Sequence, residues 1–242
     1  MTNLSVNLNK VAMLRNARPL TIPSVVKMGE ISIAAGAHGL TVHPRPDERH
    51  IRRTDVYDLA ALLQQHPTIE YNIEGNPLES PFMEIIREVR PDQCTLVPDN
   101  PLQNTSDHGW NVIQDAQKLK PIIAELNELG CRVSLFMDAD VEQIERVSDL
   151  GCDRIELYTE PYATAYRQGQ GQESFSIYQQ AAKCAQACGL GVNGGHDLNL
   201  DNLPLFKQIP NLLEVSIGHA LTADALEMGF ANAVKAYLKA LA

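Results

Sequence analysis

The stretch GLTVHPRPDERH, residues 39–50, passes from a short apolar run into a histidine and then into a cation-rich loop that contains two prolines. The apolar and β-branched character of residues 39–42 predicts a buried strand, and the prolines prevent regular structure from continuing past His43. His43 is therefore expected at the carboxyl end of a strand. Taken alone, the segment is equally consistent with a solvated basic loop, so the rest of the chain must decide between the two interpretations.

Seven further runs share this β-prone character, and segments with helical periodicity lie between them. The eight predicted strands are residues 4–8, 39–43, 69–74, 94–97, 132–137, 154–158, 190–193 and 214–217. The predicted helices are residues 24–35, 56–65, 82–89, 114–129, 141–150, 174–188 and 221–241. Alternating strands and helices predict an α/β fold with a parallel sheet, and eight strands predict a closed (β/α)8 barrel. We therefore expect a single TIM-barrel domain over residues 1–242, with extra helical segments.

Glycines and long connections punctuate this pattern. Glycine follows several predicted helices, at Gly36, Gly130, Gly151 and Gly189, where it is the usual helix-ending residue. Two connections exceed the usual few residues, 99–110 and 160–173, and the second contains the run RQGQGQ. Both are predicted to be surface loops at strand ends, and hence candidate lids.

The overall charge is acidic, with a formal net charge of −10. Such a charge argues against nonspecific binding to nucleic acid or to an anionic membrane, so the cations after His43 predict a local anion site. Five cysteines without a CxxC motif suit a reducing compartment. The sequence also has no apolar leader segment and no run long enough to span a membrane, which favours a soluble, cytoplasmic protein.

Polar residues stand at the carboxyl end of almost every predicted strand. In a barrel of this kind these ends surround one mouth, where the chemistry of the fold is expected. A single polar residue there is more often structural, but so many at equivalent positions predict a site. The residues concerned include Asn7, Asn9, Lys10, His43, Glu74, Asp138, Glu156, His196 and His219.

The ends of the seventh and eighth strands predict a phosphate site. They contain Gly194, Gly195 and Gly218, which let backbone N–H groups approach an anion closely. Cationic residues of other loops would complete a site for two anionic groups. These residues are Arg18, Arg45 and His50.

His43, Glu74 and His196 would place two imidazoles and a carboxyl group around the same mouth. Such a set can move protons in both directions at neutral pH, which suits Schiff-base formation, enolisation, dehydration and aldol closure. Signatures of a Ser-His-Asp hydrolase, a GxGxxG dinucleotide site or a P-loop are absent from the sequence.

These residues, in this order, resemble the pyridoxine 5'-phosphate synthase family of the PdxJ type. The similarity extends over essentially the whole chain. It is carried by VAMLRNAR (11–18), TVHPRPDERHI (41–51), NIE (72–74), LVP (96–98), SLFMDAD (134–140), YA (162–163), VNGGH (192–196) and IGHA (217–220).

The resemblance implies a TIM barrel that condenses 1-deoxy-D-xylulose 5-phosphate with 3-amino-2-oxopropyl phosphate, without a metal or an organic cofactor. It implies general acid–base roles for His43, Glu74 and His196 and a stabilising role for Glu156. The loop that carries Thr105 would close over the substrates. Implied contacts to the aminoketone phosphate are Asn7, Arg18, Gly218 and His219, and those to the pentulose phosphate are Arg45, His50 and Thr105.

The resemblance also implies a homo-octamer, in which the loop carrying Arg18 reaches the site of a neighbouring subunit. Small phosphorylated molecules are the other expected partners, with no nucleic acid and no membrane among them.

The chain departs from the family pattern at several contacts. After the first strand, Asn9 and Lys10 replace a carboxylate and an imidazole by an amide and an ammonium group. Lys10 is expected to pair with phosphate as a fixed charge. Asp197 replaces a glycine and would repel a phosphate unless only its backbone N–H faces the ligand, and Glu160 is a similar acidic replacement.

A metal-dependent sugar isomerase or epimerase is an alternative enzyme class, because its ligands could be His43, His196, His219, Glu74, Glu156 and Asp138. The first strand has no HxH pair, however, and its ammonium would stand where a metal is expected. Loss of activity on chelation would support this class.

A catalytically silent relative that only binds a phosphorylated ligand is the second alternative. The altered contacts at Asn9, Lys10 and Asp197 favour it. The intact His43, Glu74 and His196 argue against it. Tight ligand binding without turnover would identify such a protein.

Overall fold

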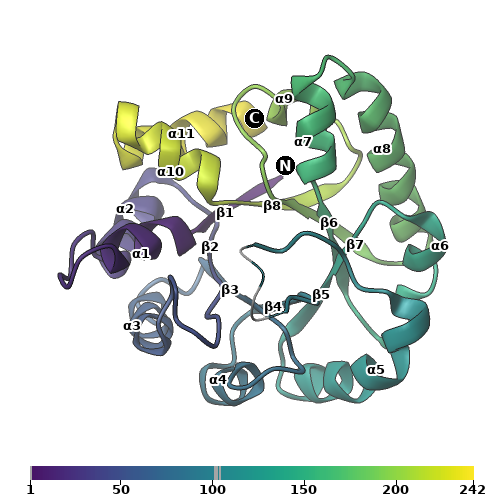
Figure 1. The fold of residues 1–242 in the computed structure, drawn as a ribbon, viewed down its shortest axis with the longest axis horizontal. Coiled ribbons are helices and arrows are strands. Elements are labelled where there is room, and N and C mark those ends of the chain that lie inside the picture. Colours follow the sequence, from purple (N-terminus) through teal and green to yellow (C-terminus); the bar gives the residue numbers. More distant parts are fainter. Residues whose placement is uncertain (1, 101–102, 104) are drawn as a thin grey trace.

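The computed structural model describes residues 2–100, 103 and 105–242. Within them, eight parallel strands close into a barrel in the order β1 to β8, and helices surround it (Figure 1). The predicted TIM barrel is thus confirmed. The strands are β1 (Asn3–Asn7), β2 (Gly39–Val42), β3 (Glu70–Gly75), β4 (Gln93–Leu96), β5 (Arg132–Met137), β6 (Arg154–Tyr158), β7 (Gly191–Gly195) and β8 (Leu212–Ile217).

Each predicted strand begins and ends within two residues of an observed strand. The helices lie outside the strands. None of the described helices combines the length and the apolar character needed to cross a lipid bilayer. The helices are α1 (Asn9–Asn16), α2 (Val25–Ala35), α3 (Arg53–Leu63), α4 (Phe82–Val89), α5 (Val112–Glu128), α6 (Val141–Ile144), the 3-10 helix η1 (Val147–Leu150), α7 (Glu160–Arg167), α8 (Gly171–Ala187), α9 (Leu203–Phe206), α10 (His219–Met228) and α11 (Phe230–Leu241).

Glycine conformation explains several helix ends. Gly36, Gly130, Gly151 and Gly189 all have positive φ angles, between 81° and 104°, as expected for left-handed helix ends. Gly229, with φ of 82°, separates α10 from α11. The sequence predicted one helix over 221–241, so this break is a correction.

The second predicted long loop, 160–173, is also corrected. Most of it forms α7 and the start of α8, separated by a short turn at Gly169, where φ is 80°. Tyr162 of α7 is fully buried, and its ring packs against Tyr178 and Phe206 at centroid distances of 5.8 and 5.2 Å. This packing stabilises a segment whose Gly-Gln composition predicted a loop. In contrast, residues 99–110 form no helix or strand where they are described.

Three further differences concern helices. Residues 141–150 form α6 and η1 rather than one helix. The short helix α9 was not predicted. Neither was α1, which begins two residues after β1 and therefore lies at the barrel mouth.

The barrel has an apolar outer layer and a polar interior. Between the strands and the helices lies one large cluster of buried apolar side chains. Inside, hydroxyl and amide groups connect neighbouring strands: Ser5 Oγ lies 2.6 Å from Thr41 Oγ1, and Thr95 Oγ1 donates to Asn72 Oδ1 at 3.1 Å. Polar side chains along the axis are therefore held by one another rather than by solvent.

At the amino-terminal end of the barrel, a set of charged and amide groups forms what we call the lower network. Arg132 donates to both carboxylate oxygens of Glu70, and its Nε donates to Gln93 Oε1 at 2.9 Å. Gln93 Nε2 donates to Glu214 Oε1 at 3.2 Å, and Arg154 lies 3.8 Å from the same carboxylate. Each acid in this network therefore has a guanidinium partner.

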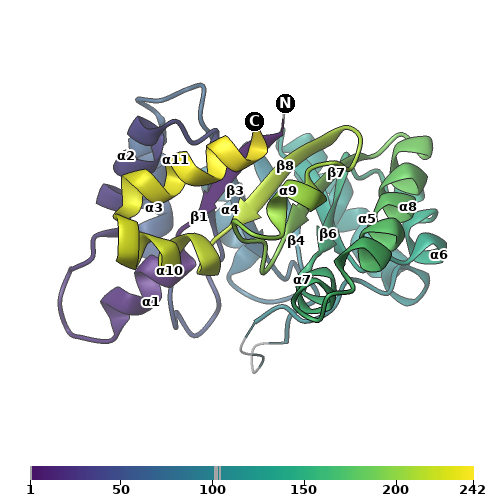
Figure 2. The same cartoon turned by 90° about the horizontal axis from the view of Figure 1, so that it is seen from above.

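Both ends of the chain lie at this amino-terminal end of the barrel. Figure 2 shows the N and C labels side by side, away from α1 and α7, which directly follow the carboxyl ends of β1 and β6. The last helix, α11, packs against β1.

Candidate active site

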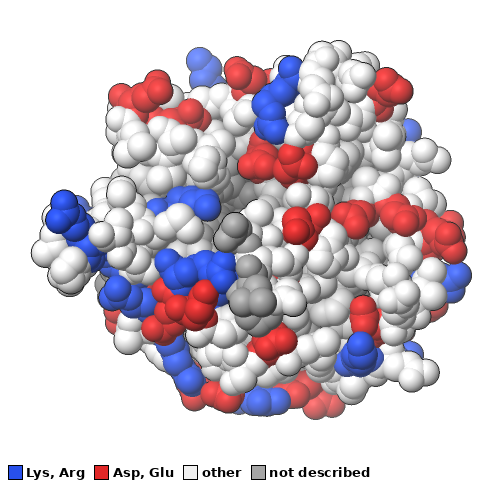
Figure 3. Space-filling model, in the orientation of Figure 1, with Lys and Arg blue, Asp and Glu red and all other residues white. Residues whose placement is uncertain are grey.

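A cavity of about 270 Å³ opens at the carboxyl ends of the strands and appears as a hollow in the surface (Figure 3). Because the strands are parallel, all the loops that follow them meet there. Asp138, Gly194, Gly195 and Arg18 are not among the lining residues, whereas all the other predicted site residues line this cavity. They are Asn7, Asn9, Lys10, His43, Arg45, His50, Glu74, Thr105, Glu156, His196, Asp197, Gly218 and His219.

Arg18 lies outside the cavity. It is exposed in the loop after α1, and its backbone N–H donates to Arg15 O at 3.3 Å. Within this chain, therefore, the structure does not bring Arg18 to the other predicted contacts.

Four lining residues were not among the predicted site residues: Ser106, Tyr158, Glu160 and Ser216. Two of them follow from strand periodicity, since residues two apart in a strand face the same side. Tyr158 is two residues after Glu156, and Ser216 is two residues before Gly218. Ser106 and Glu160 follow strand ends, in segments without a recognisable motif.

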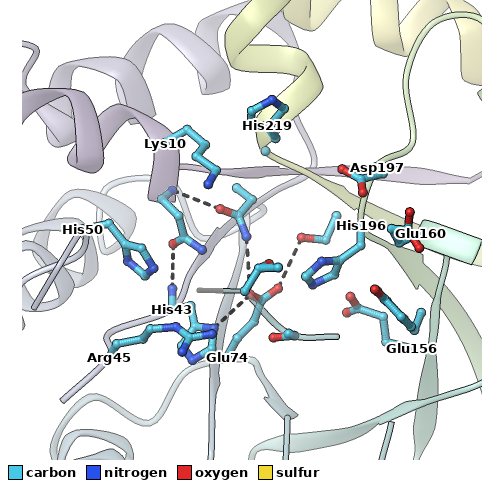
Figure 4. Close-up of a pocket in the computed structure, with 17 residues that line it drawn as sticks. Lys10, His43, Arg45, His50, Glu74, Glu156, Glu160, His196, Asp197 and His219 are labelled. Atoms are coloured by element: carbon cyan, nitrogen blue, oxygen red, sulfur yellow. Dashed lines mark hydrogen bonds and ion pairs between the residues drawn. The ribbon is translucent and has the colours of Figure 1, made fainter. Parts of the chain in front are cut away.

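Glu74, near the end of β3, lies deep in the cavity (Figure 4). Its Oε2 is 3.9 Å from His43 Nδ1 and accepts a 3.4 Å hydrogen bond from Asn7 Nδ2, and Ser216 Oγ donates to Oε1 at 3.4 Å. Burial, followed by the charge of Asp99, raises the pKa of Glu74 to about 8. At neutral pH this carboxyl group is therefore mainly a proton donor.

His43 follows β2 directly and is positioned through its backbone. Its N–H donates to Asn9 Oδ1 at 2.9 Å, which assigns the amide at position 9 a positioning contact. Burial, followed by the charge of Arg45, holds the pKa of His43 well below its usual value. The same two causes lower the pKa of His50 to about 4. Both rings are consequently neutral at pH 7.

His196 follows β7 and has a φ of 79°, which turns its ring into the cavity. The ring packs against Phe136 and Tyr158, with centroid distances of 5.2 and 5.5 Å. Burial lowers its pKa to about 4, against the opposing effect of Asp197. His196 is therefore a second neutral imidazole, held by aromatic contacts.

Glu156 of β6 is almost completely buried, and its Oε2 has no hydrogen-bond partner among the described residues. Burial, followed by the charge of Glu74, raises its pKa well above the usual value. A Cβ atom at Gly195 on the neighbouring strand would overlap the Glu156 carboxyl group. Glycine at position 195 is therefore required for this carboxyl group to lie where it does.

Arg45 connects the β2 loop with the loop after β4. Its Nη2 donates to Asp99 Oδ2, which also accepts from Ser106 Oγ at 2.7 Å, and its Nη1 donates to Gln103 O at 2.9 Å. Thr105, beside Ser106, is exposed on the same loop. These contacts hold the loop at the edge of the cavity.

The site thus combines two neutral imidazoles that can accept protons with a carboxyl group that can donate one. Lys10, Arg45 and His219 add groups that can bind an anion. Among the described residues, no group of three or more His, Cys, Asp or Glu side chains is arranged to hold a metal ion. The arrangement fits repeated proton transfer on a phosphorylated substrate.

Comparison with solved structures gives the fold alone. A 4-hydroxy-2-oxoglutarate aldolase aligns with a TM-score of 0.64 at 16% identity, over 99% of this chain and 94% of that chain. A phosphoribosylanthranilate isomerase from Thermotoga maritima aligns with a TM-score of 0.59 at 13% identity, over 100% and 98% of the two chains.

Comparison of sequences is more specific. Pyridoxine 5'-phosphate synthase of Albidiferax ferrireducens is 53% identical over 247 residues, covering 100% of this chain and 98% of that protein. The synthases of Xanthomonas campestris pv. campestris and Brucella abortus are 52% and 53% identical, over 100% and 99% of this chain and 96% and 98% of theirs. The family model for pyridoxal phosphate biosynthesis protein PdxJ matches residues 4–242. The chain therefore belongs to the PdxJ family.

Proposed function

We propose that the chain is a pyridoxine 5'-phosphate synthase of vitamin B6 biosynthesis. It condenses 1-deoxy-D-xylulose 5-phosphate with 3-amino-2-oxopropyl phosphate and releases inorganic phosphate and water. The observation that carries the proposal is the convergence of His43, Glu74 and His196 in one buried cavity, with both imidazoles neutral and the carboxyl group protonated at pH 7.

The proposed chemistry is general acid–base catalysis. His43 and His196 accept protons as the amine adds to a carbonyl and as the adduct enolises. Glu74 donates a proton to a departing oxygen and recovers it through His43, whose Nδ1 is 3.9 Å away. Glu156, unpartnered at Oε2, stabilises a polar intermediate in the same cavity. No resident metal or organic cofactor takes part.

The substrate contacts follow from the same cavity. Arg45, His50 and Thr105 contact the pentulose phosphate, with Lys10 as an additional cation beside them. The aminoketone phosphate contacts Asn7, Gly218 and His219, and the N-terminus of α10 at His219 favours an anion there. Closure of the loop after β4 keeps water out during dehydration and ring formation.

The protein is proposed to act in the cytoplasm as a homo-oligomer, an octamer by family resemblance. Large apolar side chains are exposed on α1, on the loop after α1 and on α10. Helices α1 and α10 contact each other. They offer a surface on which a second copy would bury apolar area and bring Arg18 to a neighbouring site. The residues are Met13, Leu14, Leu20, Ile22, Leu226 and Met228.

Incubation of the purified protein with both phosphates, with and without a chelator, tests the proposal. Pyridoxine 5'-phosphate is followed by chromatography and inorganic phosphate release in parallel. We expect both products in equal amounts, unaffected by the chelator. Binding of the phosphates without product would contradict the synthase proposal, and loss of activity with the chelator would indicate the metal-dependent class.

A further inference from the structure

The cavity has two sides of opposite charge. Lys10 and Arg45, from the segments after β1 and β2, lie on one side, and Glu160 and Asp197, from the segments after β6 and β7, lie across from them (Figure 4). Figure 3 shows the same division at the surface, with acidic atoms beside the hollow near α7 and basic atoms across it. A substrate carrying groups of both signs would therefore have one orientation.

Asp197 and Glu160 form the outer part of the acidic side. The Asp197 carboxylate has no hydrogen bond or ion pair to a described residue, and only its backbone oxygen is used, by Asn202 Nδ2 at 3.0 Å. Glu160 already has two partners in its own helix, since its Oε1 accepts a hydrogen bond from Thr164 Oγ1 and lies 3.6 Å from Arg167.

Two buried groups line the same cavity, and each has an oxygen atom without a hydrogen-bond partner among the described residues. Glu156 is 1% exposed with a free Oε2, and Tyr158 is 7% exposed, lines the cavity and makes no hydrogen bond through its hydroxyl group. Buried polar atoms normally have partners, so unpaired ones in a cavity indicate a ligand. Here the free atoms are oxygens that can accept hydrogen bonds.

An acidic side lined by oxygens and an aromatic ring suits a cation that donates several hydrogen bonds. Ammonium groups have three donors and bind well beside aromatic rings. The absence of a metal-ligand arrangement among the described residues leaves an organic ammonium as the better fit.

We propose that Glu156, Tyr158, Glu160 and Asp197 bind the protonated primary amino group of the substrate and so select an aminoketone phosphate over its hydroxyketone counterpart. The inference rests on the proposed function for the identity of the substrate. His196 stands between this corner and Glu74, so one of its neutral ring nitrogens can take the proton from the bound ammonium. The amine is then free to attack the carbonyl group.

Calorimetric titration tests this selection directly. The ligands are 3-amino-2-oxopropyl phosphate and dihydroxyacetone phosphate, which differ only in the amino and hydroxyl groups. We expect the wild type to prefer the amine and the double variant Asp197→Asn/Glu160→Gln to lose about tenfold of that preference, since each charge contributes a few-fold. Asparagine tolerates the φ of 56° at position 197, so the backbone is preserved.

Asp201→Asn is the matched control, because it removes one exposed charge from the same loop without lining the cavity. It should keep the wild-type preference. In turnover, the double variant should raise the KM for the aminoketone more than it lowers kcat.

Equal binding of the two ligands by the wild type, or an unchanged preference in the double variant, would overturn the inference without affecting the synthase proposal. A clear preference for the amine without formation of pyridoxine 5'-phosphate would instead contradict the synthase and leave the ammonium site standing.

Discussion

Acidic side chains lie along the barrel axis at both ends, but their surroundings differ. At the amino-terminal end, Glu70 and Glu214 lie within 4 Å of Arg132 and Arg154, respectively. At the carboxyl end, Glu74 has the neutral His43 but no guanidinium or ammonium group within the same range among the described residues, and Glu156 has no ion pair there.

This difference separates structural charge from chemical charge. A carboxyl group with a guanidinium partner holds strands together, and at Glu214 the charge of Arg154 opposes the rise in pKa that burial causes. A buried carboxyl group without one keeps a proton instead, because burial raises its pKa. The two ends thus have similar acidic residues with different partners, and each end can be altered separately.

Glu74→Gln should have the largest effect. The amide keeps the shape of the side chain but cannot donate and recover a proton, so product formation should fall at least about 100-fold. Steady-state kcat measures the loss. A variant that retains more than a tenth of the activity would show that Glu74 is not the proton donor, and unchanged circular dichroism would confirm that the fold is intact.

Arg154→Met tests the ion pair at the amino-terminal end of the barrel. It leaves Glu214, whose side chain is 4% exposed, without its guanidinium, which should cost about 3 kcal/mol of unfolding free energy. Urea unfolding measures the cost, while activity per folded molecule should persist. Arg154→Met/Glu214→Gln should recover much of the stability, and a double variant no better than the single one would argue against charge pairing as the cause.

The pH dependence of stability should sharpen the contrast. The native state keeps the Glu74 proton up to about pH 8, whereas the unfolded chain releases it near the ordinary pKa of 4.5. Raising the pH through this window therefore destabilises the native state, and Glu74→Gln should gain about 4 kcal/mol over the wild type between about pH 5 and pH 8. Urea midpoints of both proteins at several pH values measure the difference. A difference that does not change with pH would contradict the raised pKa.

Ser24→Ala provides the smallest change and belongs to neither end. Ser24 Oγ accepts from the backbone N–H of Lys27 at the start of α2. Its loss should cost about 1 kcal/mol, with activity unchanged. Urea unfolding of this variant and of the Arg154 variant shows whether the lower network contributes more unfolding free energy than an ordinary helix cap. A larger loss from Ser24→Ala than from Arg154→Met would reverse the comparison.

The fold could be predicted largely because strand and helix periodicities are local. Residues 39–42 form a strand whatever lies beyond them, and the alternation of such runs implies a parallel barrel. The breaks between helices were harder to predict from the sequence. Gly229 ends a helix, although the apolar repeat continues across it. The helix at Tyr162 depends on contacts with Tyr178 and Phe206, which no local pattern contains.

The site could be predicted in part for a related reason. The strand ends of a parallel barrel meet at one mouth, so His43, Glu74 and His196 could be assigned to one site from the sequence. Charge pairing could not be predicted, because Arg154 and Glu214 are 60 residues apart in sequence and only the closed barrel brings them together. Tyr158 was also missed, although its spacing from Glu156 was sufficient to place it on the same face of β6.

The neighbouring ends of the chain, remote from the cavity, offer a route for re-engineering the molecule. A short linker between α11 and β1 would close the chain into a circle without crossing the mouth. New ends could then be opened at the exposed turn around Gly169, between two helices that already pack as a pair. Fluorescent or affinity fusions attached at the original ends would leave the hollow at the opposite end accessible to substrate.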